Sequence, residues 1–280
     1  MSILITQSAL LAATVAYPFT NARIGHHTIT RDGTLTASTD QTGSPAYAAG
    51  LPNTYESWIP NEVPAWIQVD HGSSIVCDYI GIAAHDIGTT GANIAVQYSS
   101  DGISWSDAVT STAFTDDTPI MIFFDEINAR YWRLYITGAI PTIGVWYVGK
   151  ALAMQRAVYG GHSPITLSRN NTVRANTSEG GQFLGRYIVR SSVETTAKFQ
   201  HLTASWYRSY FDKFVLSARQ YPFFFAWRPT DYPREVAYAW TTGDIRPANM
   251  GIGDLMEVSF NMKGIGAYEG SDVNVYPGGS

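Results

Sequence analysis

Short runs of strand-forming residues, separated by turn sequences, fill residues 25–150 and constrain the fold more than any other feature. In the run 93–98 the apolar residues Ile94, Val96 and Tyr98 take every second position, as in a strand with one buried face. The turn Ser99-Ser100-Asp101-Gly102 follows, and Asp-Gly tolerates the positive φ of a hairpin turn. Many short strands at this spacing predict an antiparallel sandwich or jelly roll, with further strands at 65–70, 77–84, 120–124 and 131–137.

The positions of several large side chains on these runs predict how they pack. Between two of the runs, His71-Gly72-Ser73 is expected to turn the chain. Trp66 and Trp105 are expected to wedge between the two sheets. Arg130 and Arg133 lie on an otherwise apolar strand, and a strand arginine near a core needs a partner. We expect them to pair with carboxylates such as Asp70 or Asp101, and direct ligand contact is the alternative.

Composition narrows the class of protein. The chain has 280 residues, 45% hydrophobic and 15% charged, so it is long enough for two globular domains rather than a disordered chain. A net charge of −5 argues against a nucleic-acid-binding surface. The single Cys77 excludes an intramolecular disulfide and a multi-cysteine zinc site. It stands in an apolar run, which favours a buried thiol over a nucleophile.

The N-terminal run ALLAATVAY at 9–17 is apolar, but no Lys or Arg precedes it. A secretory signal has a positively charged region before its apolar stretch, so this run is interpreted as an opening strand and its turn. No stretch reaches the roughly 18–20 apolar residues of a membrane span. The sequence therefore predicts no transmembrane segment, and a chain that is soluble after synthesis in a reducing cytoplasm.

The second half predicts a separate β domain with one helix. The Gly-rich stretch 159–164 marks a boundary, which gives domains at 1–155 and 156–280. A helix near 203–219, capped by Thr203 or Ser205, is predicted by an apolar stripe of Trp206, Tyr207, Tyr210, Phe211, Phe214, Val215 and Ala218. Residues 170–181 are interpreted as a loop or long hairpin, and strands are predicted at 183–191, 194–202, 221–229, 236–240 and 254–263.

No set of residues predicts catalysis. The six histidines are dispersed, and His26 and His27 are adjacent, so on a strand they face opposite sides. Ser163 lacks the glycine that a hydrolase elbow requires two residues later. Asp116 and Asp117 lie in a predicted loop, and nothing marks a glycosidase pair. The chain is therefore predicted not to be an enzyme, with no catalytic residue and no metal ligand.

Five sequence elements of the first half stand in a distinctive order. They are Thr54-Tyr55-Glu56-Ser57-Trp58, Trp66-Ile67-Gln68-Val69-Asp70-His71-Gly72, Tyr79-Ile80-Gly81-Ile82, Ser99-Ser100-Asp101-Gly102-Ile103-Ser104-Trp105 and Ala129-Arg130-Tyr131-Trp132-Arg133. This series resembles the discoidin, or F5/8 type C, domains, which are also seen as galactose-binding-like carbohydrate modules. The resemblance implies a jelly-roll β-sandwich.

The resemblance also implies where a ligand would bind. Related carbohydrate modules bind ligands in loops at one end of the sandwich, which here correspond to 52–61 and 85–93. An aromatic face packs on a sugar ring while nearby polar groups fix its hydroxyls, so the candidate glycan-binding residues are Asn53, Tyr55, Glu56, Trp58 and His85. The alternative for Trp58 is that it is the family's core tryptophan.

Calcium is the one cofactor that the resemblance raises. Many relatives carry a structural calcium near an Asp-Gly-Asn turn. The corresponding stretch here, Ala49-Gly50-Leu51-Pro52-Asn53, lacks the carboxylate that calcium prefers. No cofactor is therefore predicted.

The second half has a resemblance of its own. The stretches 222–229 (PFFFAWRP), 236–245 (VAYAWTTGDI) and 256–260 (MEVSF) resemble the minor tail and tail-hub domains of long-tailed bacteriophages. Residues 21–25 (NARIG) are similar to phage tail proteins that fuse such a domain to a discoidin module. The resemblance implies a structural subunit of a tail tip or baseplate, assembled in the host bacterial cytoplasm and located in the virion tail.

The implied partners follow from that setting. The C-terminal domain would form a homo-oligomeric ring around the tail axis, while the sandwich projects toward neighbouring tail proteins (tube, hub or fibre) or host surface glycan. An aromatic content of 13% suits such assembly, since interfaces concentrate Tyr, Trp and Phe. The alternative is a carbohydrate-binding, lectin-like protein whose second domain is a spacer. A hydrolase is a third hypothesis, but no carboxylate can be named as its catalytic residue.

Overall fold

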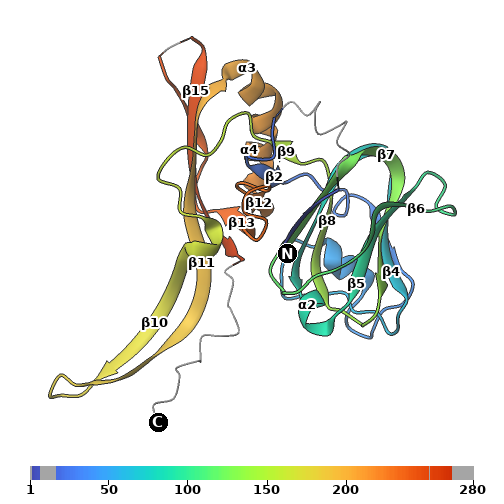
Figure 1. Cartoon of the computed structure of the whole chain (residues 1–280), viewed down its shortest axis with the longest axis horizontal. Helices are drawn as coiled ribbons and strands as arrows, with labels where there is room; N and C mark the ends of the chain where they lie inside the picture. Colours follow the sequence, from blue (N-terminus) through green and yellow to red (C-terminus); the bar gives the residue numbers. More distant parts are fainter. Residues whose placement is uncertain (1, 7–16, 252, 267–280) are drawn as a thin grey trace.

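The computed structural model describes residues 2–6, 17–251 and 253–266. Residues 9–16, which hold most of the predicted opening strand, lie outside this part of the chain. Figure 1 shows two β-rich bodies side by side, a sandwich and a second body that carries the main helix. The structure thus confirms the predicted fold class, a mostly β chain with a discoidin-like sandwich and a helix in the second half.

The sandwich is one continuous hydrogen-bonded sheet that folds over itself. Its strand order is β3-β4-β7-β5-β6, with β8 on β4 and β1 on β7. All of these pairs are antiparallel except β1 with β7. The strands are β1 (Ile3–Ile5), β3 (Thr34–Ala37), β4 (Ala65–His85), β5 (Asn93–Ser99), β6 (Ser106–Ala113), β7 (Ile120–Thr137) and β8 (Ile143–Gly149).

Two strands are much longer than predicted, because predicted pairs of short strands are joined. The stretch His71-Gly72-Ser73 bends β4 but does not end it, with φ of +83° at Gly72. The register between β4 and β7 shifts between Asp70 and Ile75. Each long strand therefore crosses from one layer of the sandwich to the other, as strands do where a bulge turns a sheet corner.

The core between the layers is apolar and contains three fully buried tryptophans, Trp58, Trp132 and Trp146. The expectation that Trp66 and Trp105 wedge between the sheets is wrong, since both are partly exposed. The alternation along 65–70 buries Ala65, Ile67 and Val69, so Trp66 faces the opposite side. Cys77 is buried in this core, as predicted, and burial raises the pKa of its thiol.

The second body is built on another sheet, of order β10-β11-β15-β13-β12-β2-β9 with β14 on β15. Its strands are β2 (Arg23–Gly25), β9 (Leu152–Ala153), β10 (Arg169–Thr177), β11 (Phe183–Thr203), β12 (Phe223–Ala226), β13 (Val236–Thr241), β14 (Arg246–Asn249) and β15 (Leu255–Ile265). Strands β2 and β9 lie before the boundary predicted near residue 155. The sheet of the second half thus draws two strands from the first.

The predicted helix is present as one continuous segment, made of α3 (Ala204–Trp206), the π-helical turn η3 (Tyr207–Phe211) and α4 (Asp212–Ala218). Most of the predicted stripe faces the core, and Phe214 packs edge-on against Phe223 at 4.9 Å between ring centroids. Tyr210 is 56% exposed, because the wider π turn shifts the face that a regular helix would bury. Thr203 precedes the helix, but its side chain makes no capping hydrogen bond.

A third apolar cluster joins the two bodies. Tyr79, Phe123 and Tyr147 of the sandwich pack with Phe224 and Tyr238 of the second body. The Tyr238 hydroxyl also donates to the carbonyl of Pro52 at 2.8 Å. One layer of the sandwich is thus covered on both faces, which explains why all of β8 is buried.

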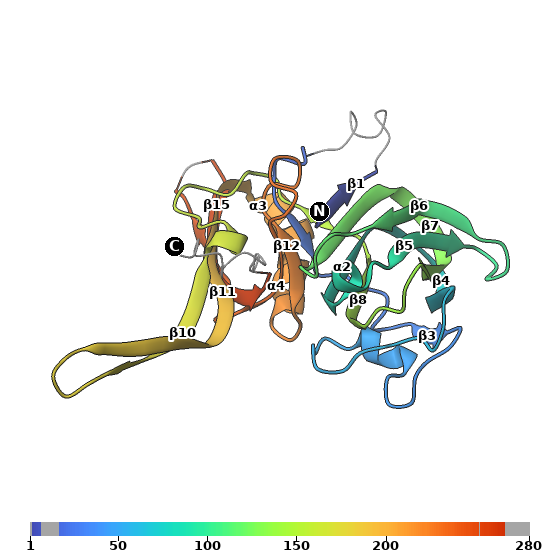
Figure 2. The same cartoon turned by 60° about the horizontal axis from the view of Figure 1, so that its bottom comes forward.

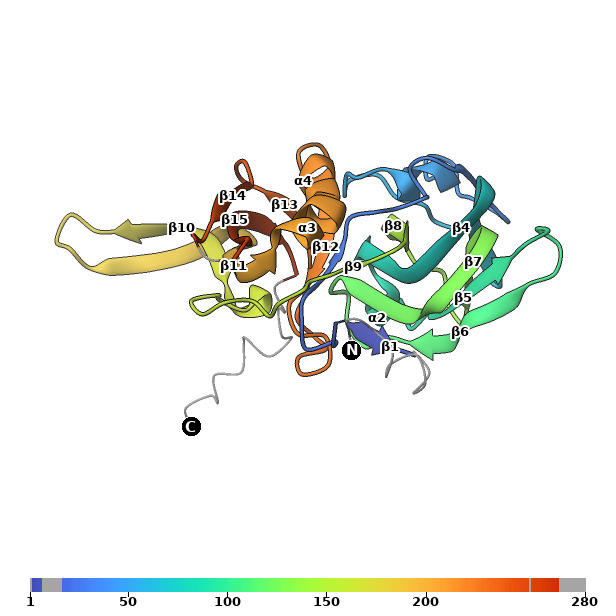
Figure 3. The same ribbon diagram turned by 90° about the horizontal axis from the view of Figure 1, so that it is seen from above.

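A hairpin of β10 and β11 extends from the second body, and no other helix or strand drawn in Figures 2 and 3 packs on it. We call residues 169–192 the arm. Strand β15 pairs with β11 only from Val193 onward, so among the described residues β10 and β11 pair only with each other within the arm. Every residue of β10 is exposed. The predicted hairpin is therefore present, and it projects away from the sandwich.

Asp78 at the junction makes stability depend on pH. Its carboxylate accepts a hydrogen bond from the Ala151 N–H at 2.7 Å, and burial raises its pKa from 3.8 to about 7. Between these values the folded state holds a proton that the unfolded state has lost, so stability falls as pH rises.

Asp78→Asn keeps an acceptor but does not ionise. We expect it to match the wild type near about pH 4 and to be the more stable protein near about pH 8. Urea unfolding at both pH values measures the difference. A gap that does not widen with pH would contradict this origin.

Candidate functional site

Four segments meet at one end of the sandwich. They are residues 38–64, 86–92, 114–119 and 138–142, which we call the loop end. Their flanking strand ends are paired: Asn93 lies opposite Thr137 and Ala113, and His85 lies opposite Ile143. The five predicted glycan-binding residues lie in or directly beside these segments.

The structure brings three of the predicted residues together in an exposed unit. The Asn53 side-chain amide donates to Glu56 Oε2 at 2.7 Å, and the Glu56 N–H donates to Asn53 Oδ1 at 3.1 Å. Tyr55 between them is 84% exposed. The loop therefore presents an aromatic ring beside a fixed amide–carboxylate pair.

The other two predicted residues face the interior. Trp58 is fully buried, its indole N–H donates to the carbonyl of Thr39 at 3.1 Å, and its backbone pairs with Ile143. His85 is 7% exposed, and its Nε2 lies 2.9 Å from the carbonyl oxygen of Thr118. Burial lowers the pKa of His85. Neither ring offers a face to a ligand, and the alternative interpretation of Trp58 as a core tryptophan is confirmed.

The residues that replace the relatives' calcium turn do not fit a calcium ion. Ala49 and Gly50 are buried in a short 3-10 helix, η1 (Ala46–Gly50). Asn53 uses its oxygen and its amide on Glu56. Across the described residues, no three His, Cys, Asp or Glu side chains gather in a way that could hold a metal.

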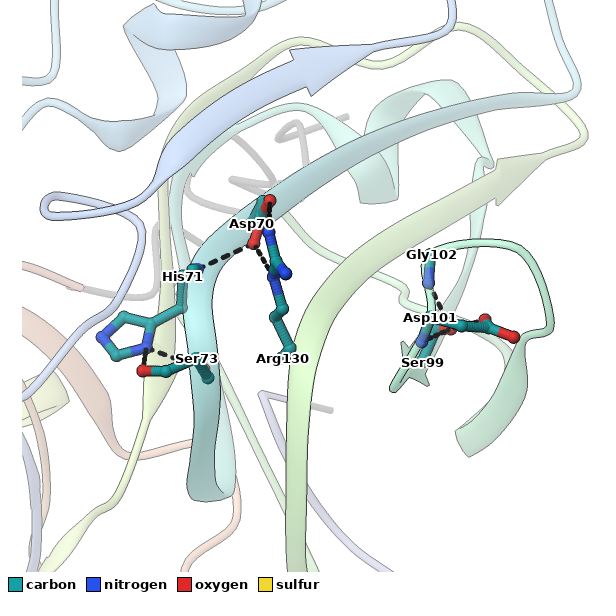
Figure 4. Close-up of polar contacts among 8 residues, drawn as sticks. Asp70, His71, Ser73, Ser99, Asp101, Gly102 and Arg130 are labelled. Atoms are coloured by element: carbon teal, nitrogen blue, oxygen red, sulfur yellow. Dashed lines mark hydrogen bonds and ion pairs between the residues drawn. The ribbon is translucent and has the colours of Figure 1, made fainter.

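At the opposite end of the sandwich the motif residues hold the fold together (Figure 4). Arg130 binds Asp70 through two bonds, Nε to Oδ1 at 2.7 Å and Nη2 to Oδ2 at 2.8 Å. This hydrogen-bonded arginine lowers the pKa of Asp70. The pair clamps β4 to β7 at the bend, as predicted for Arg130.

Asp101 and Arg133 serve the fold separately. Asp101 Oδ1 accepts the N–H groups of Ile103 and Ser104, each at 2.8 Å, and these bonds lower its pKa to about 2. The prediction that Arg133 pairs with a carboxylate is wrong. Its Nε donates to Gln97 Oε1 at 2.7 Å, and its guanidinium lies over the Trp105 ring at 3.9 Å. The guanidinium of Arg133 is instead stabilised by the side-chain amide of Gln97 and the aromatic face of Trp105.

Sequence reasoning missed the aromatic and acidic character of the loop end. Tyr47, 61% exposed on η1, is a second exposed tyrosine there. The loop end contains no Lys or Arg, whereas six carboxylates lie in it: Asp40, Glu56, Glu62, Asp86, Asp116 and Asp117. A count of charge by segment would have found this excess, but the net charge of the whole chain concealed it.

Comparison with known proteins agrees with this geometry. Residues 34–153 match the F5/8 type C domain model, so the chain carries a domain of this family. The comparison with curated protein sequences gives no match. None of the helices in the described part of the chain is long and apolar enough to span a membrane.

Several solved structures are similar to the chain over this domain. A chitosan-binding module of a chitosanase/glucanase from Paenibacillus sp. IK-5 has 24% identity and a TM-score of 0.39, covering 44% of this chain and 98% of that one. A CBM32 module from Clostridium perfringens, in complex with GalNAc-β-1,3-galactose, has 13% identity and a TM-score of 0.39, covering 44% and 99%. A pectin-binding carbohydrate-binding module has 18% identity and a TM-score of 0.37, covering 41% and 88%.

The different burial of the two aromatic residues predicts different effects on stability. Trp58→Ala leaves a cavity in the core and should lower the free energy of unfolding by roughly 3–5 kcal/mol. Tyr55→Ala removes an exposed side chain and should change it by less than about 0.5 kcal/mol. Urea unfolding of both variants measures this, and equal losses would contradict the assigned positions.

Proposed function

We propose that the chain is a structural subunit of a bacteriophage tail tip or baseplate. Copies would assemble into a homo-oligomeric ring around the tail axis, and the F5/8 type C domain would project toward host surface glycan or neighbouring tail proteins. The arm is the observation that carries the assembly. The tail setting is supported by the sequence resemblance of 222–260.

The arm has the properties of an unfinished interface. Five large apolar side chains on it are more than half exposed: Phe183, Leu184, Tyr187, Ile188 and Val189. A two-stranded hairpin is at best marginally stable alone in water, and exposed apolar groups clustered on one element mark interaction sites. The arm therefore needs a partner to cover it.

Removing the arm tests the assembly. We expect the full chain to form ring-shaped particles and a variant with a short Gly-Ser turn in place of 170–192 to be monomeric, because the covering contact is lost. Mass by analytical ultracentrifugation and electron micrographs of the particles provide the measurement. Leu216→Ala, which removes a 58% exposed apolar side chain from α4, is the matched control and should assemble normally. A full chain that stays monomeric at high concentration would overturn the proposal.

A second function, glycan binding by a lectin-like protein with a spacer domain, is favoured by the Asn53–Glu56 unit. Exposed Tyr55 offers a flat apolar face, and the neighbouring amide and carboxylate are held by hydrogen bonds to each other. An aromatic face with fixed polar neighbours is the arrangement that recognises a sugar ring.

Substitution of the exposed tyrosine tests glycan binding without disturbing the core. On a glycan array, Tyr55→Ala should reduce binding by about tenfold or more, since the stacking face is lost. Tyr47→Ala removes another exposed tyrosine of the same loop end and serves as the control. Equal binding by the wild type and Tyr55→Ala would remove this residue from the site.

A further inference from the structure

Charge is divided unevenly along the molecule. Between residues 34 and 150 the sandwich has twelve Asp and Glu against three Lys and Arg. The arm has the opposite balance, with four arginines and one glutamate. The net charge of the whole chain is −5, and this total does not show that the two regions have opposite charge.

The acidic excess of the sandwich is exposed at the loop end. Asp40, Glu62 and Asp117 are exposed there, and no Lys or Arg in the described chain forms an ion pair with them. Among the described residues, Asp117 accepts hydrogen bonds from the N–H and the hydroxyl of Thr89. Asp116 differs: burial raises its pKa, but hydrogen bonds from the Thr118 hydroxyl and N–H lower it more, and Arg234 of the second body adds a smaller lowering contribution.

The arm carries its positive charge among apolar side chains. Arg174 lies opposite Tyr187, Arg186 opposite Ala175 and Arg190 opposite Thr172 in the register of the hairpin. None of these three arginines has an ion-pair partner within the described chain. Arg174, Tyr187 and Arg190 share one face of the hairpin, whereas Arg186 lies on the other face. The face with two arginines and a tyrosine matches a surface that has exposed aromatic rings and carboxylates.

The loop end offers that combination. Tyr47 and Tyr55 are exposed in the same loop segments that hold Asp40 and Glu62. The arm and the sandwich lie at opposite ends of the molecule in all three views. An arm of nine paired residues is roughly 30 Å long and points away from its own sandwich. Only a second copy can bring the two surfaces together.

We propose that the arm of one copy docks on the loop end of the next, with Arg174 and Arg190 facing Asp40, Glu62 and Asp117. This inference rests on the proposed assembly and names its contact. The contact is heterologous, so one copy uses two different surfaces, and repetition gives a ring or a filament. Complementary charge fixes the register and speeds the encounter.

Charge reversal in the full chain tests the pairing. The double variant Arg174→Glu, Arg190→Glu and the triple variant Asp40→Lys, Glu62→Lys, Asp117→Lys should each weaken assembly about tenfold or more in about 0.1 M salt, because like charges then face each other. A chain with all five substitutions should assemble again. Analytical ultracentrifugation measures the dissociation constants, and urea unfolding checks that each variant is folded.

Two controls and two outcomes make the test decisive. Asp107→Lys lies on β6 outside the loop end, and Arg219→Glu lies outside the arm, so neither should alter assembly. If the arm deletion abolishes assembly but the loop-end reversal leaves it intact, the docking surface is wrong while the proposed assembly stands. If the full chain never assembles, both the proposed assembly and the proposed docking contact are wrong.

Discussion

The apolar contact between the two bodies is the interaction on which the rest of the structure depends. A sandwich of this kind normally exposes the outer face of each layer, but here Tyr79 and Tyr147 on one outer face pack against Phe224 and Tyr238. Gly81 lies so close to the Phe224 ring that an added Cβ would stand 2.5 Å from it. This contact fixes the direction of the sandwich relative to the arm, and therefore places the acidic and basic surfaces at opposite ends.

The residues that identify the family are used mainly to build the domain. Arg130 with Asp70 clamps the two long strands at their bend, and Asp101 organises the hairpin turn. Arg133 is held by Gln97 and Trp105. In the loop end, Trp58 also serves the core, whereas Tyr47 and Tyr55 are exposed and have no such role.

The sequence predicted those strands and helices whose residues follow a regular local spacing. Alternation along 93–98 gave a strand, and the aromatic stripe gave the helix that contains Phe211 and Phe214. It did not predict that β4 is one strand, because a bulge at Gly72 looks like a turn until its hydrogen-bond partner in β7 is known. At the loop end Tyr55 is exposed, whereas His85 is buried against Thr118, which is far away in the sequence. Such contacts have no local signal.

Strands β2 and β9 also determine how the chain is organised. They pair directly, Arg23 with Ala153 and Ile24 with Leu152, and nearly the whole sandwich lies in the chain between them. The sandwich is thus an insertion into the second body. The chain leaves that body after β2 and returns at β9, and these two strands are neighbours. A module attached at one such point can be exchanged by recombination for another without changing the strand order of the host sheet. The two bodies of this protein can consequently evolve at different rates.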